Sequence, residues 1–183
     1  DNYQWDVAKV PDSHRAITEQ AYTWFEARKR QLMRSRCIVF TGAGSLYGVS
    51  LEAAVKFWEM PQVISIGYEL EEGMHGPNYG YDYNHCVIVL NDGGKESEKA
   101  KSLARFMKEV NHNGLMIGTE TVDESDLKLD IRGGEFACLE FSAVPQVMAY
   151  YLTEDGGRDL TKPNDRLKVM GSYFRTHSEK EEA

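Results

Sequence analysis

Short apolar runs alternate with longer amphipathic stretches, and this alternation most constrains what the 183-residue chain can fold into. The first run, Cys37–Phe40, is rich in β-branched residues, as is typical of a strand covered on both faces. Gly42 and Gly44 then allow a sharp turn into a helical stretch over 48–60. A second short run, Val63–Ile66, follows it. Two strands joined by a helix predict a parallel strand pair.

The rest of the chain continues the alternation. Pro11-Asp12-Ser13 is a helix-start signal, which predicts that the first helix runs from His14 to Arg34. Residues 156–183 are polar and predict an irregular C-terminal tail. The chain is therefore predicted to be one α/β domain, a three-layer αβα sandwich with a parallel sheet of about five strands. The other predicted elements are a helical turn over 68–72, strands over 86–90, 114–118 and 127–131, and helices over 96–110 and 136–152.

The composition excludes several classes of protein. Hydrophobic residues make up 42% and charged residues 27% of the chain, and the net charge of −8 argues against sequence-independent binding of nucleic acid. No apolar run is long enough to span a membrane, and no signal peptide is evident. Cys37, Cys86 and Cys138 have no metal-ligand spacing and predict reduced core thiols in the cytoplasm. The start at Asp1 suggests a processed protein or an excised domain.

The helix over 48–60 carries a narrow charged stripe. Glu52, Lys56 and Glu59 fall within roughly 60° of one another at about 100° per residue, and the rest of the circumference is mostly apolar. This pattern predicts a mostly buried helix whose charges line a cleft. The alternative is a surface ion pair that steadies the helix by roughly 0.2–0.5 kcal/mol. Geometry alone leaves both open.

Three segments carry a resemblance to a known family. GAGSLYGVSLEAAVKFWEM at 42–60, EEGMHGP at 71–77 and GGRDLTKPNDRLKV at 156–169 resemble the sugar isomerase (SIS) domain. They are most similar to the second SIS half of the glucosamine-6-phosphate synthase and fructosamine-6-phosphate deglycase group. The resemblance implies a flavodoxin-like SIS fold, a sugar 6-phosphate substrate and no metal or organic cofactor. It also implies a homodimer or higher homo-oligomer, and that this is the C-terminal half of a longer protein with an N-terminal SIS half.

The resemblance assigns roles to five side chains. Glu59 matches the acid/base carboxylate of aldose–ketose interconversion, supported by Glu52 and Lys56. His75 matches the ring-opening histidine, which in the synthases acts on the neighbouring subunit's site. Lys168 matches a tail lysine that forms a Schiff base with the keto sugar. The residue types suit this chemistry, because a partly buried glutamate beside other carboxylates has its pKa raised toward neutral and histidine titrates near pH 7.

Phosphate binding is where the chain departs from the family pattern. The resemblance places substrate contacts at Gly44, Ser45 and Tyr47, where a helix N-terminus would bind an anion weakly. The loop over 91–95, Asn-Asp-Gly-Gly-Lys, lacks the Ser/Thr-rich phosphate loop of the first SIS half. This difference, with Gly73-Met74 before His-Gly-Pro, favours a catabolic relative over housekeeping glucosamine-6-phosphate synthesis.

Three functions therefore remain as hypotheses. The first is isomerase, deglycase or aminotransferase chemistry on a hexose or fructosamine 6-phosphate. The second is a non-catalytic domain that senses a sugar phosphate in a regulator. The third is a structural half that completes a dimer. An intact set of Glu59, Lys56, His75 and Lys168 favours the enzyme, because a sensor needs no proton shuttle.

Overall fold

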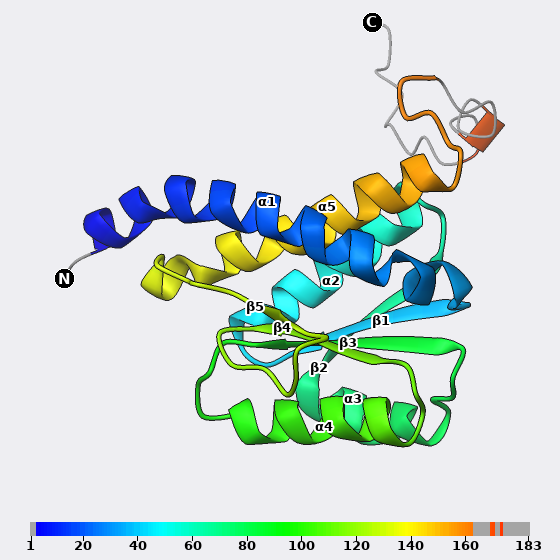
Figure 1. Ribbon diagram of the computed structural model, residues 1–183, viewed down its shortest axis with the longest axis horizontal. Helices are drawn as coiled ribbons and strands as arrows, with labels where there is room; N and C mark the ends of the chain where they lie inside the picture. The colour runs from blue at the N-terminus through cyan, green and yellow to red at the C-terminus, as the bar shows by residue number, and fades with distance from the viewer. Residues whose placement is uncertain (1–2, 163–168, 171–172, 174–183) are drawn as a thin grey trace, which may run out of the picture.

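The computed structural model describes residues 3–162, 169, 170 and 173. Five strands form one parallel sheet in the order β2-β1-β3-β4-β5. Their carboxyl ends lie at the left of Figure 1. The predicted α/β class and the five-stranded parallel sheet are confirmed. The strands are β1 (Cys37–Gly42), β2 (Ile64–Glu69), β3 (His85–Asn91), β4 (Gly114–Gly118) and β5 (Leu127–Lys128).

Helices cover both faces of the sheet. Three of them lie above it in Figure 1 and two below, which gives the predicted three layers. The upper helices are α1 (Tyr3–Arg34), α2 (Ser45–Glu59) and α5 (Ala137–Asp155), and the lower ones are α3 (Leu70–Met74) and α4 (Ser97–Glu109). Two short 3-10 helices, η1 (Pro77–Tyr79) and η2 (Gly134–Phe136), complete the described elements.

Alternate side chains of the central strands enter two separate cores. In β1, Ile38 and Phe40 belong to the core under α1, α2 and α5, whereas Val39 belongs to the core under α4. The Phe40 ring meets the Phe57 ring of α2 edge-on, with 5.1 Å between centroids. Because both faces of β1 and β3 are covered, their near-continuous apolar sequence is the expected one for central parallel strands.

The first helix differs from its prediction. It begins at Tyr3, and Pro11 lies inside it instead of marking its start. Ser13 does not cap a helix: its hydroxyl donates to the Val10 carbonyl at 3.1 Å and to the buried carboxylate of Glu140 on α5. Packing against α5 therefore outweighs the backbone hydrogen bond that proline removes.

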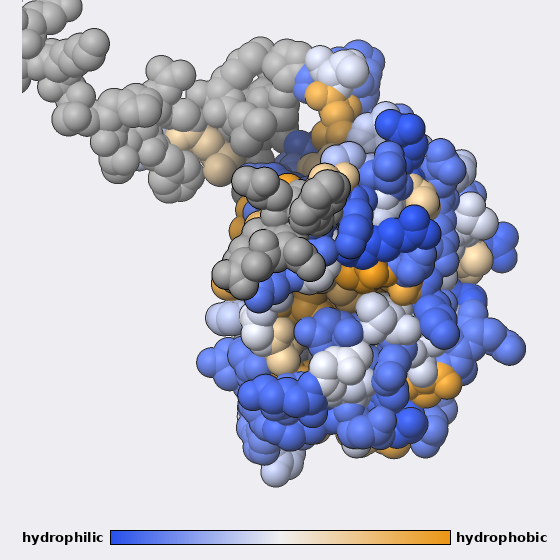
Figure 2. Space-filling view, turned by 90° about the vertical axis from the view of Figure 1, so that its left-hand side faces the viewer, coloured by the Kyte–Doolittle hydropathy of each residue, from blue (hydrophilic) through white to orange (hydrophobic). Residues whose placement is uncertain are grey.

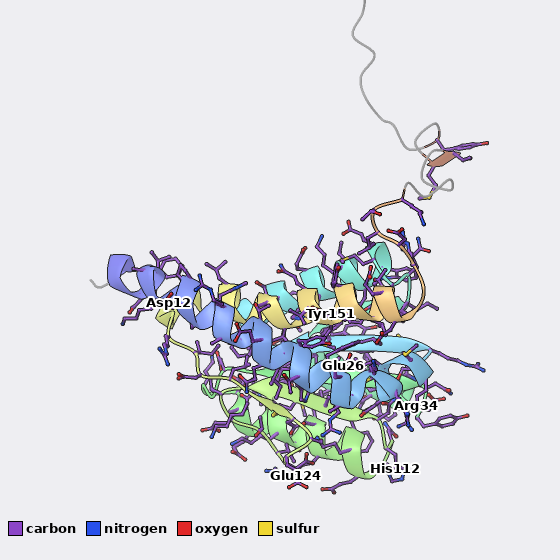
Figure 3. The ribbon with its side chains drawn as sticks, turned by 45° about the horizontal axis from the view of Figure 1, so that its top comes forward. Asp12, Glu26, Arg34, His112, Glu124 and Tyr151 are labelled. Carbon is purple, nitrogen blue, oxygen red and sulfur yellow. The ribbon has the colours of Figure 1, made fainter. Side chains whose placement is uncertain are left out.

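The junction of α1 with α5 is aromatic. Tyr151 of α5 projects toward α1 in Figure 3, and its ring centroid lies 4.4 Å from that of Tyr22. At the end of α1, Arg34 donates to the His112 carbonyl at 3.4 Å, and the two lie near each other in Figure 3. Helix α1 is thereby fixed to the body of the domain at two places.

Smaller differences concern element ends. Helix α2 begins at Ser45, three residues earlier than predicted. Strand β2 continues to Glu69, so the predicted helical turn over 68–72 begins two residues later, as α3. Strand β5 stops at Lys128, although Leu129 still donates its N–H to the Gly118 carbonyl at 2.8 Å. Within the described part of the chain, no helix is long and apolar enough to cross a membrane.

Candidate functional site

A cavity of about 460 Å³ opens at the carboxyl ends of the strands, beside the junction of β1 and β3. The chain leaves these two neighbouring strands in opposite directions across the sheet, and open α/β sheets place their ligands at such a point. Figure 2 faces this side and shows a small hydrophobic area bordered by hydrophilic residues. The lining residues are Ser45, Leu46, Asp92, Gly93, Gly94, Thr119, Ile131, Gly134, Glu135, Ala137 and Phe141.

The loop after β3 forms one wall through its own hydrogen bonds. The Gly93 N–H donates to the Asn91 side chain at 3.1 Å, and the Gly94 N–H donates to the Asp92 carboxylate at 2.8 Å. Gly93 has φ of +77°, and a Cβ there would lie 2.6 Å from the Thr119 hydroxyl. Only glycine suits this position, because a side chain would meet both strain and a clash.

A buried carboxylate holds the opposite wall in place. Glu140 is fully buried, and it accepts the Arg132 N–H at 2.9 Å and the Gly133 N–H at 2.8 Å, besides the Ser13 hydroxyl. These donors supply the partners that a buried carboxylate needs. Glu140 therefore fixes the loop that leads into Gly134 at the cavity.

The cavity is acidic and does not suit phosphate. Asp92 and Glu135 contribute carboxylates and Ser45 and Thr119 contribute hydroxyls, while no Lys or Arg is among the described residues that line it. Helix α2 begins here without a side-chain cap, but its partial positive end faces two formal negative charges. Of the predicted substrate contacts only Ser45 lines this cavity; Gly44 and Tyr47 do not.

The charged stripe on α2 has the predicted internal contacts. The Lys56 ammonium lies 2.8 Å from a Glu59 carboxylate oxygen and 3.5 Å from one of Glu52. The hydrogen bond with Glu59 raises the pKa of Lys56, and the Glu52 charge adds to this, so the lysine remains a cation at neutral pH.

The prediction of a mostly buried helix is wrong. Leu51, Val55 and Trp58 are 43%, 46% and 52% exposed, and they form what we call the outer face of α2. The Glu59 side chain is 57% exposed beside them. Helix α2 packs on β2, which is an edge strand, so no described element lies beyond it to cover this face. The described residues therefore leave the Glu59 carboxylate open to water.

His75 lies on the other side of the sheet. It follows α3, its side chain is 76% exposed, and its Nδ1 is 2.8 Å from the Glu71 carbonyl oxygen. The Glu71 carboxylate pairs with Lys99, and this hydrogen bond lowers the pKa of Glu71. His75 is therefore next to an ionised carboxylate but in open surroundings.

The predicted site residues are not gathered in one place. Ser45 and Glu59 occupy opposite ends of α2, about 21 Å apart at 1.5 Å per residue. His75 follows a helix of the opposite layer. Lys168 lies outside the described residues. In the described part of the chain, no group of three or more His, Cys, Asp or Glu side chains could hold a metal ion.

Sequence reasoning missed Arg158, which joins the end of α5 to the end of α2. Its guanidinium donates to the Glu59 carbonyl at 3.1 Å and also to the Met60 carbonyl. No local pattern indicates a contact between residues 99 apart. It also missed Asp92 and Glu135, although glycines directly beside each of them mark sharp turns at that edge of the sheet.

Comparisons with known proteins agree with this architecture. The chain is 25% identical over 168 residues to a glutamine–fructose-6-phosphate aminotransferase of Sulfurisphaera tokodaii, which covers 90% of this chain. A candidate phosphosugar isomerase from Clostridium difficile 630 superimposes with a TM-score of 0.79 and 26% identity over 92% of the chain. A glucosamine-6-phosphate deaminase from Thermotoga maritima has the same fold, with a TM-score of 0.60 and 24% identity over 87% of the chain.

These relatives are longer than the chain. It spans 28% of the aminotransferase, 50% of the Clostridium protein and 46% of the Thermotoga protein. A family model described as the SIS domain matches residues 31–153, which run from the end of α1 through nearly all of α5 and include the sheet, the cavity loops and the α2 stripe. The chain belongs to the SIS domain family.

Proposed function

We propose that this chain supplies the acid/base residues of an enzyme that processes a hexose or hexosamine 6-phosphate. The observation that carries the proposal is the Glu52–Lys56–Glu59 stripe, which is held together on α2 and faces outward beside an apolar surface. The names of the aminotransferase and of the candidate phosphosugar isomerase share a phosphorylated sugar, which supports isomerase or aminotransferase chemistry, while deglycase chemistry is proposed from the sequence resemblance alone. Glu59 would move a proton between the first two carbons of the sugar.

Lys56 has a defined part in this mechanism. Because the hydrogen bond to Glu59 raises its pKa, Lys56 stays charged at neutral pH and places a cation beside the proposed acid/base residue. It also holds the Glu59 side chain in one direction through the 2.8 Å contact. Glu52, at 3.5 Å from the same ammonium, keeps Lys56 on the stripe.

We further propose that another domain covers the outer face of α2 and binds the phosphate. Carbanion-like chemistry needs a site from which water is excluded, and Glu59 is 57% exposed here. Leu51, Val55 and Trp58 offer the apolar surface that such a domain would bury. The acidic cavity at the strand ends does not offer a phosphate site. The sister SIS half of a longer protein fits these requirements.

His75 would act elsewhere in the assembly. It is exposed and lies across the sheet from Glu59, which suits ring opening in the site of a second subunit of a homodimer. The exposed Nε2 side of the ring is available, because Nδ1 is the nitrogen beside Glu71. Lys168 is proposed to form the Schiff base from the segment outside the described residues.

A non-catalytic domain is the second candidate. One observation favours it: Glu59 makes an exposed i,i+3 ion pair with Lys56, as ordinary surface helices do. In that case the stripe steadies α2, and a sugar phosphate would be bound without turnover.

Substitution of Glu59 tests the proposal. In the full-length protein, Glu59→Gln should lower kcat on fructose 6-phosphate or glucosamine 6-phosphate by roughly 10²-fold or more, because the amide cannot shuttle a proton. Glu26→Gln is the matched control, since Glu26 forms a similar exposed i,i+3 pair with Lys29 on α1. Unchanged turnover in the Glu59 variant would show that Glu59 is not the acid/base residue. Binding of the sugar phosphate without turnover in the wild type would favour the non-catalytic domain.

A further inference from the structure

We propose that Arg158 is a positioning residue that fixes the last turn of α2 and, through it, the carboxylate of Glu59. The structural part of this inference stands on the described contacts alone. Its catalytic consequence rests on the function proposed above. Arg158 is the third residue of the Gly-Gly-Arg-Asp segment that begins the C-terminal motif.

The Arg158 side chain donates hydrogen bonds to backbone carbonyls at the end of α2. One guanidinium nitrogen, Nη1, donates to the carbonyls of Glu59 and Met60. With the Gln62 amide turned so that its oxygen faces the guanidinium, that oxygen lies 3.1 Å from Nη1 and 3.3 Å from Nη2. A single planar cation therefore contacts three acceptors within four residues of chain.

This end of α2 has particular need of such a contact. The last carbonyls of a helix have no partner within the helix. Gln62 has φ of +58°, a left-handed conformation without the freedom of glycine. Two backbone hydrogen bonds close the turn. The Met60 N–H donates to the Lys56 carbonyl at 2.9 Å, and the Val63 N–H donates to the Phe57 carbonyl at 3.1 Å. A cation is also favoured at a helix C-terminus by the helix dipole.

The end of α5 places the guanidinium there. Gly157, with φ of +76°, turns the chain back, and the Arg158 N–H donates to the Thr153 carbonyl at 3.1 Å. Thr153 is buried on α5, and α5 packs directly against α2 in the main core. Arg158 is thus held by one packed helix while it binds the end of another.

The consequence for Glu59 follows from its position. Glu59 is the last residue of α2, so its side chain has the direction that the final turn gives it. If this turn frays, the carboxylate loses its fixed position relative to a substrate, and small displacements of a catalytic group lower the rate strongly. The Lys56 ammonium cannot replace this contact, because it restrains the Glu59 side chain and does not bind the carbonyls at the end of the helix.

The test uses the full-length protein with Arg158→Gln and Arg158→Lys, and with Arg132→Gln as the control. Arg132 is exposed and pairs with Asp130, far from α2 in the sequence. Amide hydrogen exchange at Met60 and Val63 should accelerate roughly tenfold in Arg158→Gln while Ala53 and Ala54 stay protected. Arg158→Lys keeps the charge but not the planar fork, so it should restore only part of the protection. Arg132→Gln should change nothing at these amides.

Kinetics with glucosamine 6-phosphate separate positioning from simple stability. Arg158→Gln should lower kcat roughly tenfold with little change in KM, and Arg158→Lys should recover part of kcat. Unchanged exchange at Met60 and Val63 would overturn the contact role. Faster exchange with normal kcat, alongside an inactive Glu59→Gln, would overturn the catalytic role. If the wild-type protein turns over no sugar phosphate, the proposed function fails, and the exchange data still decide the contact.

Discussion

Cys86 shows how burial sets the chemistry of a single side chain. It lies fully buried in β3, and desolvation raises the pKa of its thiol to about 12. Cys37 is also buried and its pKa is raised by desolvation, whereas Cys138 is partly exposed near the start of α5. Thiolate is the reactive form, so the three cysteines should differ in reactivity.

We expect Cys138 to react first with a thiol reagent at pH 8 in the folded protein. Cys86 and Cys37 should react only as fast as the protein unfolds, because their raised pKa values keep them protonated and the core excludes the reagent. Stopped-flow labelling of the wild type and of Cys138→Ser measures this. Fast labelling that persists in Cys138→Ser would contradict the burial of the other two.

Individual contacts were predictable from the sequence only where they are local. The meeting of Glu52, Lys56 and Glu59 follows from helical spacing and is confirmed. The contact of Arg158 with Glu59, and of Ser13 with Glu140, joins residues far apart in the chain. Such contacts depend on how α5 packs, which residue types do not reveal. The assigned roles of Glu59, His75 and Lys168 stay predictions.

At the scale of elements, glycine permits the close approach of α2 to β2. A Cβ at Gly67 would lie 2.6 Å from the Ser50 carbonyl oxygen and 2.8 Å from the Leu51 nitrogen. These are backbone atoms of α2, so they cannot turn aside as a flexible side chain would. At Gly48, inside the same helix, nothing lies within 4 Å of such a Cβ.

Alanine should therefore have opposite effects at the two glycines. Gly67→Ala should lower the free energy of unfolding by roughly 1–3 kcal/mol, because α2 must move off the sheet. Gly48→Ala should raise it by roughly 0.5–1 kcal/mol, since alanine is the better helix former. Urea unfolding of both variants provides the measurement. Equal changes in the free energy of unfolding would show that a side chain at position 67 does not clash with α2.

Element type was easier to predict than element ends or burial. Strands β1 and β3 are recognisable because central parallel strands are apolar throughout. The predicted start of α1 is wrong because the helix continues through Pro11, whose missing hydrogen bond is offset by packing against α5. The predicted burial of α2 is wrong because the sequence pattern shows which residues are apolar but not whether another element of the chain covers them, and Leu51, Val55 and Trp58 are exposed.

Over the whole molecule, carboxylates outnumber cations, and several of them are held ionised by specific donors. The hydrogen bond from Lys99 lowers the pKa of Glu71, and the one from Lys101, with Ser97, lowers that of Glu120. The Asn84 N–H, with His85, lowers the pKa of Asp82. A group whose pKa is lower in the folded state than in the unfolded state stabilises the protein above its ordinary pKa.

Stability should consequently fall as the solution is acidified. The contributions of these carboxyls are complete above about pH 4.5 and are lost as the pH falls through their lowered values. The urea midpoint should therefore hold between pH 7 and 5 and decrease below 4.5. The double variant Lys99→Gln/Lys101→Gln should flatten this decrease. A midpoint that rises between pH 4.5 and 3 would contradict it.

The position of β2 at the end of the sheet has a consequence for handling the chain. Ile64 and Ile66 are 51% and 38% exposed on this strand, and no strand among the described residues pairs with its outer backbone groups. An uncovered, apolar strand edge is a template on which a further chain can add its own strand. When the domain is produced alone, β2 is therefore where aggregation would begin, and a charged residue at position 66 is the simplest protection against it.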